Sequence, residues 1–430
     1  TGLLRPDAGQ VLVHGVDVWT QPQRAKTLLG VLPDGLRTFD RLNGLELVTY
    51  SGLLRGLERD VVVPRATELV KVLGLWDAGT TLVADYSAGM RKKIHLACAM
   101  VHSPSILVLD EPSSNLDEGS IAVLKTMLHT LKEKGITILI AEHRLYYLMD
   151  LVDRVVFLEK GRLCKLFSRE EFLALPEENI KAMGLRSRIK PDLSLPEWKN
   201  EGALKYQKED RFVSFSFGKI YGIVGENGIG KSTFLCKLSG LENEKGSHFS
   251  LFGKELSKRQ RLAISAMVMQ DVNQQLFGDS VEEEMELGKT GQRRGLKERS
   301  EGIIDRQENE QKKTKPHHAT KEELLNALGL SELKDRHPMS LSGGQKQRLA
   351  LAATLYQEAK LFFFDEPTSG MDQKNMLRIA SLLKSAIRED RIFFIVSHDY
   401  AFLQEVADEV VEIDSLTGNF RFPPTSESSR

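Results

Sequence analysis

The chain has 430 residues, with 59 Lys and Arg against 60 Asp and Glu, for a net charge of −1. This length allows two or three domains with sizeable cores, and the balanced charge gives no indication of a nucleic-acid partner. The three cysteines (Cys98, Cys164 and Cys236) form no CxxC pair, and no apolar run approaches the roughly 20 residues that span a bilayer, so we expect a reducing compartment and, at most, a peripheral membrane role.

One set of motifs occurs twice along the chain. The corresponding segments are Tyr86–Met90 (YSAGM) and Leu341–Gln345 (LSGGQ), Asp110–Pro112 and Asp365–Pro367 (both DEP), and His143 and His398. Each pair is separated by 255 positions, as between Ser87 and Ser342, which indicates a tandem duplication. Nearer the N-terminus the separation is 238 positions, as between Gly15 and Gly253. The extra residues of the second copy fall in the charged stretch 289–321, which predicts a solvated insertion.

The second copy alone contains a phosphate-binding pattern, described below. Its counterpart in the first copy, 238 positions before Lys231, falls ahead of Thr1. Two interpretations follow: the sequence is a fragment, or the first copy has lost its own nucleotide-binding loop. We expect the former, because the segment from Thr1 onward is otherwise intact.

The alternation of apolar runs and amphipathic segments predicts an α/β fold. Short apolar runs of the buried, parallel-strand type occupy 106–109, 137–140, 361–364 and 392–396. Met376, Ile379, Leu383 and Ile387 recur at helical spacing and predict one core-facing helix stripe. We expect a first domain over residues 1–186, a proline-containing linker over 187–200 and a second domain over 201–430, each with a parallel sheet flanked by helices.

The segment Gly225–Thr233 (GENGIGKST) has four free positions between two glycines, followed by lysine and hydroxyl residues. It follows an apolar run and precedes a helical segment, which is the strand–loop–helix context that phosphate binding requires. The loop would surround the β-phosphate with backbone N–H groups, and Lys231 would reach the β- and γ-phosphates. The Ser232 hydroxyl would bind Mg²⁺. The predicted nucleotide-binding residues here are Gly225, Asn227, Gly228, Gly230, Lys231, Ser232 and Thr233.

Polar residues at the ends of later strands supply candidates for catalysis. Asp365 ends an apolar strand and is predicted to hold Mg²⁺, while its neighbour Glu366 would deprotonate the attacking water. His398 follows another strand and would contact the γ-phosphate and the water. Gln270 would bind Mg²⁺ or water through its amide oxygen and sense the γ-phosphate.

Ser342 and Gly344 begin a predicted helix, where a serine cap and glycine N–H groups form an anion site. Taken together, the phosphate loop, Gln270, the Ser342–Gln345 segment, Asp365–Glu366 and His398 resemble the nucleotide-binding domains of ABC ATPases, twice over nearly the whole chain. The resemblance implies two tandem P-loop NTPase domains, each with a helical signature subdomain, the first lacking its loop, and hydrolysis of ATP with Mg²⁺.

In that family two such domains pair head to tail, which implies that the two halves of this chain pair with each other. ATP would then lie between the Lys231 loop and the first-half signature, where Ser87 and Gly89 are retained but Ala88 and Met90 replace the usual Gly and Gln. Asp34 stands where the family has its Gln in the first half. Tyr206 is the candidate to stack on adenine.

Two segments, 141–150 (AEHRLYYLMD) and 269–279 (MQDVNQQLFGD), resemble the tandem ATPase of energy-coupling factor (ECF) importers. That resemblance implies uptake of a vitamin or metal ion through integral membrane subunits, an ECF-type coupling protein and a substrate-binding component, with the ATPase at the cytoplasmic face of the membrane. The first 110 or so residues look more like an exporter-type ABC ATPase, and only one of the 19 phenylalanines, Phe39, precedes Asp110. This change of composition suggests two ancestries joined near Asp110, and the alternative is ordinary drift of composition between subdomains.

Two other functions compete with transport. A soluble ABC ATPase that acts on ribosomes or DNA would be expected to carry a long charged linker, a coiled coil or CxxC pairs, which this sequence lacks. An inactive product of a truncated or chimeric gene would fit the change near Asp110, but the intact second-half motifs argue against it.

Overall fold

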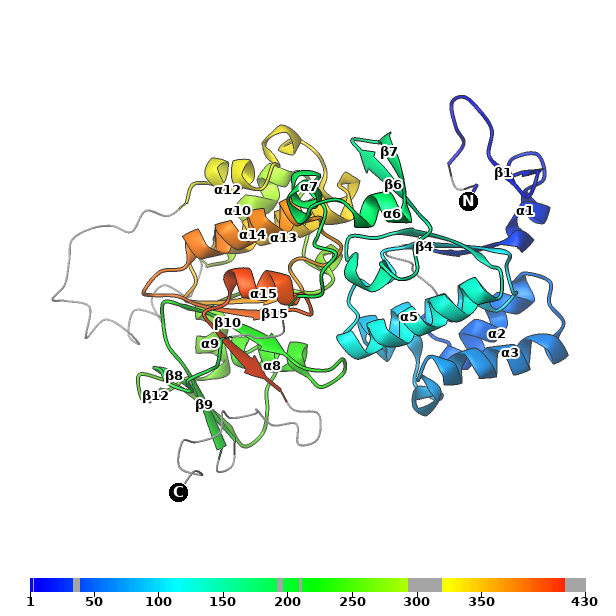
Figure 1. Cartoon of the computed structure of the whole chain (residues 1–430). Helices are drawn as coiled ribbons and strands as arrows, with labels where there is room; N and C mark the ends of the chain where they lie inside the picture. Colours follow the sequence, from blue (N-terminus) through cyan, green and yellow to red (C-terminus); the bar gives the residue numbers. More distant parts are fainter. Residues whose placement is uncertain (3, 34–38, 192–195, 209–210, 293–318, 414–430) are drawn as a thin grey trace, which may run out of the picture. The chain divides into compact units, whose positions relative to one another are not determined.

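The structure is a computed structural model (Figure 1), and it describes the chain except for residues 3, 34–38, 192–195, 209–210, 293–318 and 414–430. The chain divides into two compact units, Thr1–Lys190 (unit 1) and Pro191–Arg430 (unit 2). Asp34 and most of the charged stretch 289–321 lie outside the described residues. Among the helices that are described, none is long and apolar enough to cross a membrane.

Unit 2 contains a parallel and an antiparallel sheet. The parallel sheet has the strand order β13-β14-β15-β10-β16, with β10 (Lys219–Val224), β13 (Ser265–Val268), β14 (Leu361–Asp365), β15 (Ile392–Val396) and β16 (Glu409–Glu412). The antiparallel sheet has the order β12-β11-β8-β9, with β8 (Leu204–Lys208), β9 (Arg211–Phe215), β11 (Ser247–Leu251) and β12 (Lys254–Glu255).

The described helices of unit 2 begin at side-chain caps in most cases. They are α8 (Lys231–Ser239), α9 (Lys258–Ile264), α10 (Val281–Gln292), α12 (Lys321–Ala327), α13 (Gly343–Leu355), α14 (Gln373–Ala386) and α15 (Tyr400–Val406). Reciprocal Ser/Thr–Glu/Gln capping bonds start α9, α12 and α13, and aspartates cap α14 and α15. The predicted stripe of α14 is confirmed for Met376, Ile379 and Leu383, which are buried, but Ile387 lies just beyond the helix end.

The parallel sheet of unit 2 is covered on both faces, which explains its almost wholly apolar strands. Phe362 and Phe364 pack on one face with α13, α14 and α15. Leu361 and Phe363, whose side chains alternate with these, pack on the other face with α8 and the antiparallel sheet. The carboxyl ends of five aligned strands therefore meet at one edge of a rigid layer.

Unit 1 has a smaller parallel sheet of order β3-β4-β5 and two antiparallel hairpins. Its strands are β1 (Leu12–Val13), β2 (Val16–Asp17), β3 (Leu29–Leu32), β4 (Ile106–Asp110), β5 (Thr137–Ala141), β6 (Arg154–Glu159) and β7 (Arg162–Ser168). Its α-helices are α1 (Pro22–Leu28), α2 (Gly44–Leu54), α3 (Arg59–Val72), α4 (Ala88–Met100), α5 (Glu118–Glu133), α6 (Arg169–Leu173) and α7 (Glu177–Ala182).

The strand predicted at 137–140 forms as β5 and pairs in parallel with β4. The prediction that this strand is buried is wrong. Leu139 is 59% exposed, whereas Phe394, its counterpart in β15, is fully buried. In unit 2 the rings of Phe215, Tyr221 and Phe363 surround Phe394, and β10 pairs with β15. No strand of the described part of unit 1 takes the place of β10 beside β5, so the same kind of apolar sequence remains exposed.

The segment predicted as a linker, 187–200, is packed at both ends. Arg188 pairs with Glu177 at 2.9 Å in unit 1. Trp198 is buried in unit 2, where its indole N–H donates to the Ser214 carbonyl and its ring stacks on Phe215. The segment between Arg188 and Trp198 is therefore shorter than the linker 187–200 that the sequence predicts.

Candidate nucleotide-binding site

Four predicted site segments in unit 2 lie at the carboxyl ends of its parallel strands. Gly225 follows β10, Gln270 follows β13, Asp365 ends β14 with Glu366 next to it, and His398 follows β15. Because these strands pair side by side in one parallel sheet, their carboxyl ends lie along one edge. This edge is where open α/β sheets bind their ligands.

The loop between β10 and α8 has a positive φ at each of its three glycines, Gly225, Gly228 and Gly230. Gly225 has φ 151°, and a Cβ there would lie 2.8 Å from the Ile413 carbonyl oxygen. Gly230 has φ 102° and is the N-cap of α8. The loop therefore leads directly into the helix N-terminus, where unpaired N–H groups and the helix dipole favour a phosphate. Asn227 and Gly228 lie within this loop, and Ser232 and Thr233, both exposed, follow in the first turn of α8.

The ammonium of Lys231 is held inside the loop. Its side chain is buried, and Nζ donates to the carbonyl oxygens of Gly225 and Glu226, both at 2.8 Å. These carbonyls fix the lysine at the centre of the loop without neutralising its charge. A phosphate in the loop would meet a cation that is already in place.

Asp365 and Ser232 supply oxygen ligands suited to Mg²⁺. Burial raises the pKa of Asp365, while a hydrogen bond from the Ser232 side chain and the nearby Lys231 charge oppose the shift. A hydroxyl and a carboxylate in contact fit Mg²⁺, which usually takes one or two carboxylates with phosphate oxygens and water. Among the described residues, no group of three or more His, Cys, Asp and Glu side chains is placed to hold a metal ion.

Glu366 is held in a strained backbone conformation beside His398. Its φ is 51°, a value that costs a non-glycine residue about 1–3 kcal/mol and recurs at functional sites. Its carboxylate accepts hydrogen bonds from the His398 backbone N–H at 3.0 Å and from the Ser397 hydroxyl at 3.3 Å. The His398 ring lies 3.7 Å from the same carboxylate. This fixed carboxylate at the strand edge is placed to accept a proton from water.

Gln270 is exposed and begins a loop that is fastened to the rest of unit 2. The Gln275 side chain bonds the backbone of Met267 and Met269, and the Glu284 carboxylate accepts from the N–H groups of Phe277 and Gly278. Between these anchors, Lys346 of α13 donates to the Asn273 side chain at 2.9 Å. The loop therefore links the nucleotide edge with the signature helix.

Ser342 caps α13 in a reciprocal bond pair with Gln345, and Gly344 lies in the first turn with no neighbouring atom in the place where a Cβ would point. In unit 1, Ser87 caps α4 by accepting from the Met90 N–H at 3.2 Å, and Gly89 lies in the first turn of that helix. Met90 has no oxygen with which to return the bond. The departure from the family pattern therefore removes half of a capping box.

Met90→Gln is expected to stabilise unit 1 by about 0.5–1 kcal/mol, because the amide oxygen can accept from the Ser87 N–H. Urea unfolding followed by circular dichroism measures the change. Met90→Leu is the matched control, since it keeps the apolar bulk without an acceptor, and it should leave the free energy of unfolding nearly unchanged. Equal effects of both substitutions would show that packing of the side chain, and not the cap, decides stability.

Tyr206 is not placed as an exposed stacking surface. Its ring packs against Phe234 and Phe249, and its hydroxyl donates to Glu244 at 2.6 Å. Since the side chain is only 7% exposed, adenine stacking would need a ring face that this packing covers. The role predicted from the sequence is therefore not supported by this arrangement.

Glu142 of unit 1 lies beside Glu111, and the motifs of the sequence did not single it out. It occupies in unit 1 the position of Ser397 and accepts from the N–H groups of Ser113 and Arg144 and from the Tyr147 hydroxyl. Burial alone would raise the pKa of Glu142, but hydrogen bonds from the Glu111 side chain and from Ser113 outweigh it and lower the pKa. Glu111, the counterpart of Glu366, has the same positive φ and lies 3.3 Å from His143. A position-by-position alignment of the two copies would have revealed this serine-to-glutamate difference.

Comparison with known proteins gives a consistent result. The family model described as "ABC transporter" matches residues 1–114 and 210–369. A "Putative ABC transporter ATP-binding protein" of Treponema denticola is 36% identical over 377 residues, covering 83% of this chain and 72% of the relative. A protein of the same name from Sulfurisphaera tokodaii is 27% identical over 427 residues, covering 95% and 83%.

Among solved structures, the chain is similar to one titled "Model of ribosome-bound archaeal Pelota and ABCE1", with a TM-score of 0.61, 23% identity and coverage of 96% of this chain and 69% of that one. It is also similar to one titled "RNase-L Inhibitor", with a TM-score of 0.54, 22% identity and coverage of 93% and 75%. At this identity the likeness shows the fold, two tandem ABC ATPase domains. The family match and the strand-edge site together confirm the resemblance: the chain belongs to the ABC transporter family of ATPases, which bind ATP with Mg²⁺ and hydrolyse it.

Proposed function

We propose that this chain is the ATP-hydrolysing subunit of an importer and powers uptake of a vitamin or metal ion. Its partners are an ECF-type membrane coupling protein and a substrate-binding component, and it works at the cytoplasmic face of the membrane. The names of the curated relatives support transport, and the sequence of the Gln270 loop supports the importer class. The domains that act in this scheme are residues 1–186 and 201–430, joined by 187–200.

The observation that carries the proposal is the loop from Gln270 to Gly278. Its first residue lies at the nucleotide edge, and its centre is bonded to the signature helix through Asn273 and Lys346. Near its end, Phe277 is 77% exposed on a backbone fixed by Glu284. In this proposal, a change at the γ-phosphate would be passed along the loop to this exposed aromatic side chain, which would contact an apolar surface on the membrane partner.

Within this scheme ATP is held between the Lys231 loop and the signature of unit 1, with Ser87 and Gly89 at the phosphates. Glu366 accepts the proton of the attacking water, and His398 and Gln270 hold that water and the γ-phosphate. Mg²⁺ bound by Ser232 and Asp365 would neutralise charge on the phosphates. ATP would favour a closed arrangement of the two units, and hydrolysis would favour an open one. This change in the populations of the two conformations would be transmitted to the membrane partner.

The test replaces the gene in its host and measures uptake of labelled riboflavin, biotin, cobalt and nickel, together with sedimentation of the protein. We expect Phe277→Ala to lower uptake of one solute at least fivefold and to release the protein from the membrane fraction, with ATP binding unchanged. Phe212→Ala is the control, since Phe212 is 47% exposed on the antiparallel sheet. If the protein sedimented with ribosomes and the uptake of all four solutes were unchanged in both variants, the proposed importer function would be contradicted. The soluble ABC ATPase would then be favoured.

A further inference from the structure

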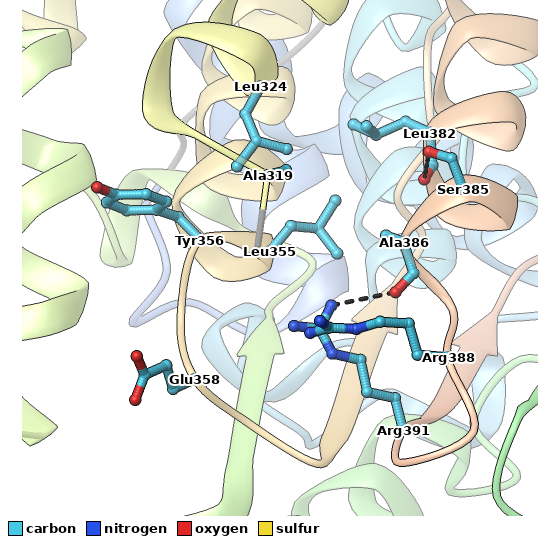
Figure 2. A pocket seen from close by; sticks show the side chains of 10 residues that line it. All are labelled: Ala319, Leu324, Leu355, Tyr356, Glu358, Leu382, Ser385, Ala386, Arg388 and Arg391. Atoms are coloured by element: carbon cyan, nitrogen blue, oxygen red, sulfur yellow. Dashed lines mark hydrogen bonds between the residues drawn. The ribbon is translucent and has the colours of Figure 1, made fainter. Parts of the chain in front are cut away.

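A cavity of about 170 Å³ lies in unit 2 beside α12, α13 and α14 (Figure 2), and its lining includes none of the candidate residues of the nucleotide edge. Its apolar wall includes Leu324 of α12, Leu355 of α13 and Leu382 of α14. Arg388 and Arg391, in the turn between α14 and β15, form its opposite wall (Figure 2). At about 15 Å³ per water-sized group, the cavity has room for roughly ten non-hydrogen atoms.

The two guanidinium groups are only partly satisfied by the protein. Arg391 is 5% exposed, and one of its nitrogens donates to the Ala386 carbonyl at 3.1 Å, while Nε is buried without a hydrogen-bond partner among the described residues. Arg388 has two such nitrogens, Nε and one terminal nitrogen. A buried charged donor without a hydrogen-bond partner destabilises the protein. Acceptor atoms of a ligand at this wall would therefore form favourable hydrogen bonds.

The nearby carboxylates do not account for these groups. Asp390 lies 3.8 Å from Arg388 Nε, beyond hydrogen-bonding distance, and is 48% exposed. Figure 2 shows the carboxylate of Glu358 on another side of the cavity, apart from both guanidiniums. Burial, and after it the neighbouring Arg388 charge, lowers the pKa of Arg391 to about 10, so Arg391 remains charged at neutral pH.

Arg391 also has a structural role, which limits what its substitution would reveal. Its guanidinium lies 5.0 Å from the centre of the Phe362 ring and caps the carboxyl end of α14. Within the described part of the chain, the Arg388 guanidinium makes no hydrogen bond of this kind, and its side chain is 22% exposed. Removing the Arg388 charge should therefore change the cavity while leaving the fold intact.

We propose that this cavity binds a small organic anion, with its carboxylate on Arg388 and Arg391 and its apolar part against Leu324, Leu355 and Leu382. Paired guanidiniums match the two oxygens of a carboxylate, and the leucines exclude water from the rest of the ligand. The site is separate from the nucleotide site and does not depend on the transport role proposed above. It lies near the carboxyl ends of α13 and α14. The signature segment is at the opposite end of α13, in its first turn, and α14 begins directly after its N-cap, Asp372.

Isothermal titration calorimetry with benzoate, an anion of this size, tests the proposal, with ADP at saturation so that the phosphate loop does not compete. We expect benzoate to bind at least tenfold more tightly than benzamide, its neutral isostere. Arg388→Gln should weaken benzoate binding about tenfold, whereas Lys384→Gln, an exposed cation of α14 outside the cavity, should leave it unchanged.

Retained ADP binding by Arg388→Gln shows that the variant is folded. Equal binding of benzoate and benzamide would overturn the proposal, as would benzoate binding that is absent or that is insensitive to Arg388→Gln. If inorganic phosphate bound as tightly as benzoate and with the same dependence on Arg388, the proposal that the ligand has an apolar part held by the leucines would be wrong.

Discussion

Glu366→Gln is expected to lower the turnover of ATP by about 10²–10⁴-fold while ATP binding is retained, since general-base catalysis contributes effects of this size. The carboxylate is fixed by hydrogen bonds from the His398 N–H and the Ser397 hydroxyl, so a glutamine of the same shape can keep the first bond through its amide oxygen. It cannot take a proton from water. Release of phosphate measures turnover, and the ATP that remains bound after gel filtration with Mg²⁺ gives the number of nucleotides per chain.

Glu111→Gln is the matched control for this substitution. Glu111 has a similar positive φ and a histidine at 3.3 Å, but it lies in unit 1, whereas the Lys231 loop and Glu366 lie at the strand edge of unit 2. Turnover at the Lys231 loop should therefore stay within about twofold of the parent chain, because Glu111 belongs to unit 1 and is not part of the strand edge that carries this loop. One retained ATP per Glu366→Gln chain supports a sandwich between the two units. If none is retained, the intramolecular arrangement proposed here is wrong.

The placement of the candidate site residues of unit 2 along one strand edge could be predicted from sequence, because it depends on local patterns. The spacing of Gly225, Lys231 and Ser232 sets a loop and a helix start, and Asp365 is placed by the apolar strand directly before it. Parallel strands then bring these segments to one edge without any information on side-chain contacts. The strained φ of Glu366 could not be predicted, because the surrounding hydrogen bonds enforce it.

Features that depend on tertiary surroundings were missed or misjudged. Leu139 lies in an apolar run like that of Phe394, but its exposure is decided by which strand and aromatic rings lie beside it. Tyr206 has a suitable ring for a base, and yet Phe234, Phe249 and Glu244 already contact it. Periodicity reports which residues are apolar and not what covers them, so these outcomes required the structure.

Lys231→Ala is expected to weaken ATP binding at least 100-fold, because each charge-assisted hydrogen bond to phosphate contributes about 1.5–3 kcal/mol and Lys231 is predicted to reach two phosphates. The substitution also removes the donor that Gly225 and Glu226 share at 2.8 Å, so the loop loses its central support. Calorimetry measures the dissociation constant, and the rise in melting temperature with ATP gives a second measure of the same binding.

Lys237→Ala controls for the loss of a lysine from α8. Its ammonium pairs with Glu244 at 2.8 Å, toward Tyr206 and Lys208 rather than the phosphate loop. That variant should lose some stability, since Glu244 keeps only Lys208 as a cationic partner, but its ATP affinity should change less than threefold. If ATP still raised the melting temperature of Lys231→Ala as much as that of the parent chain, the nucleotide would be bound elsewhere. The catalytic roles proposed for Glu366 and His398 would then be wrong.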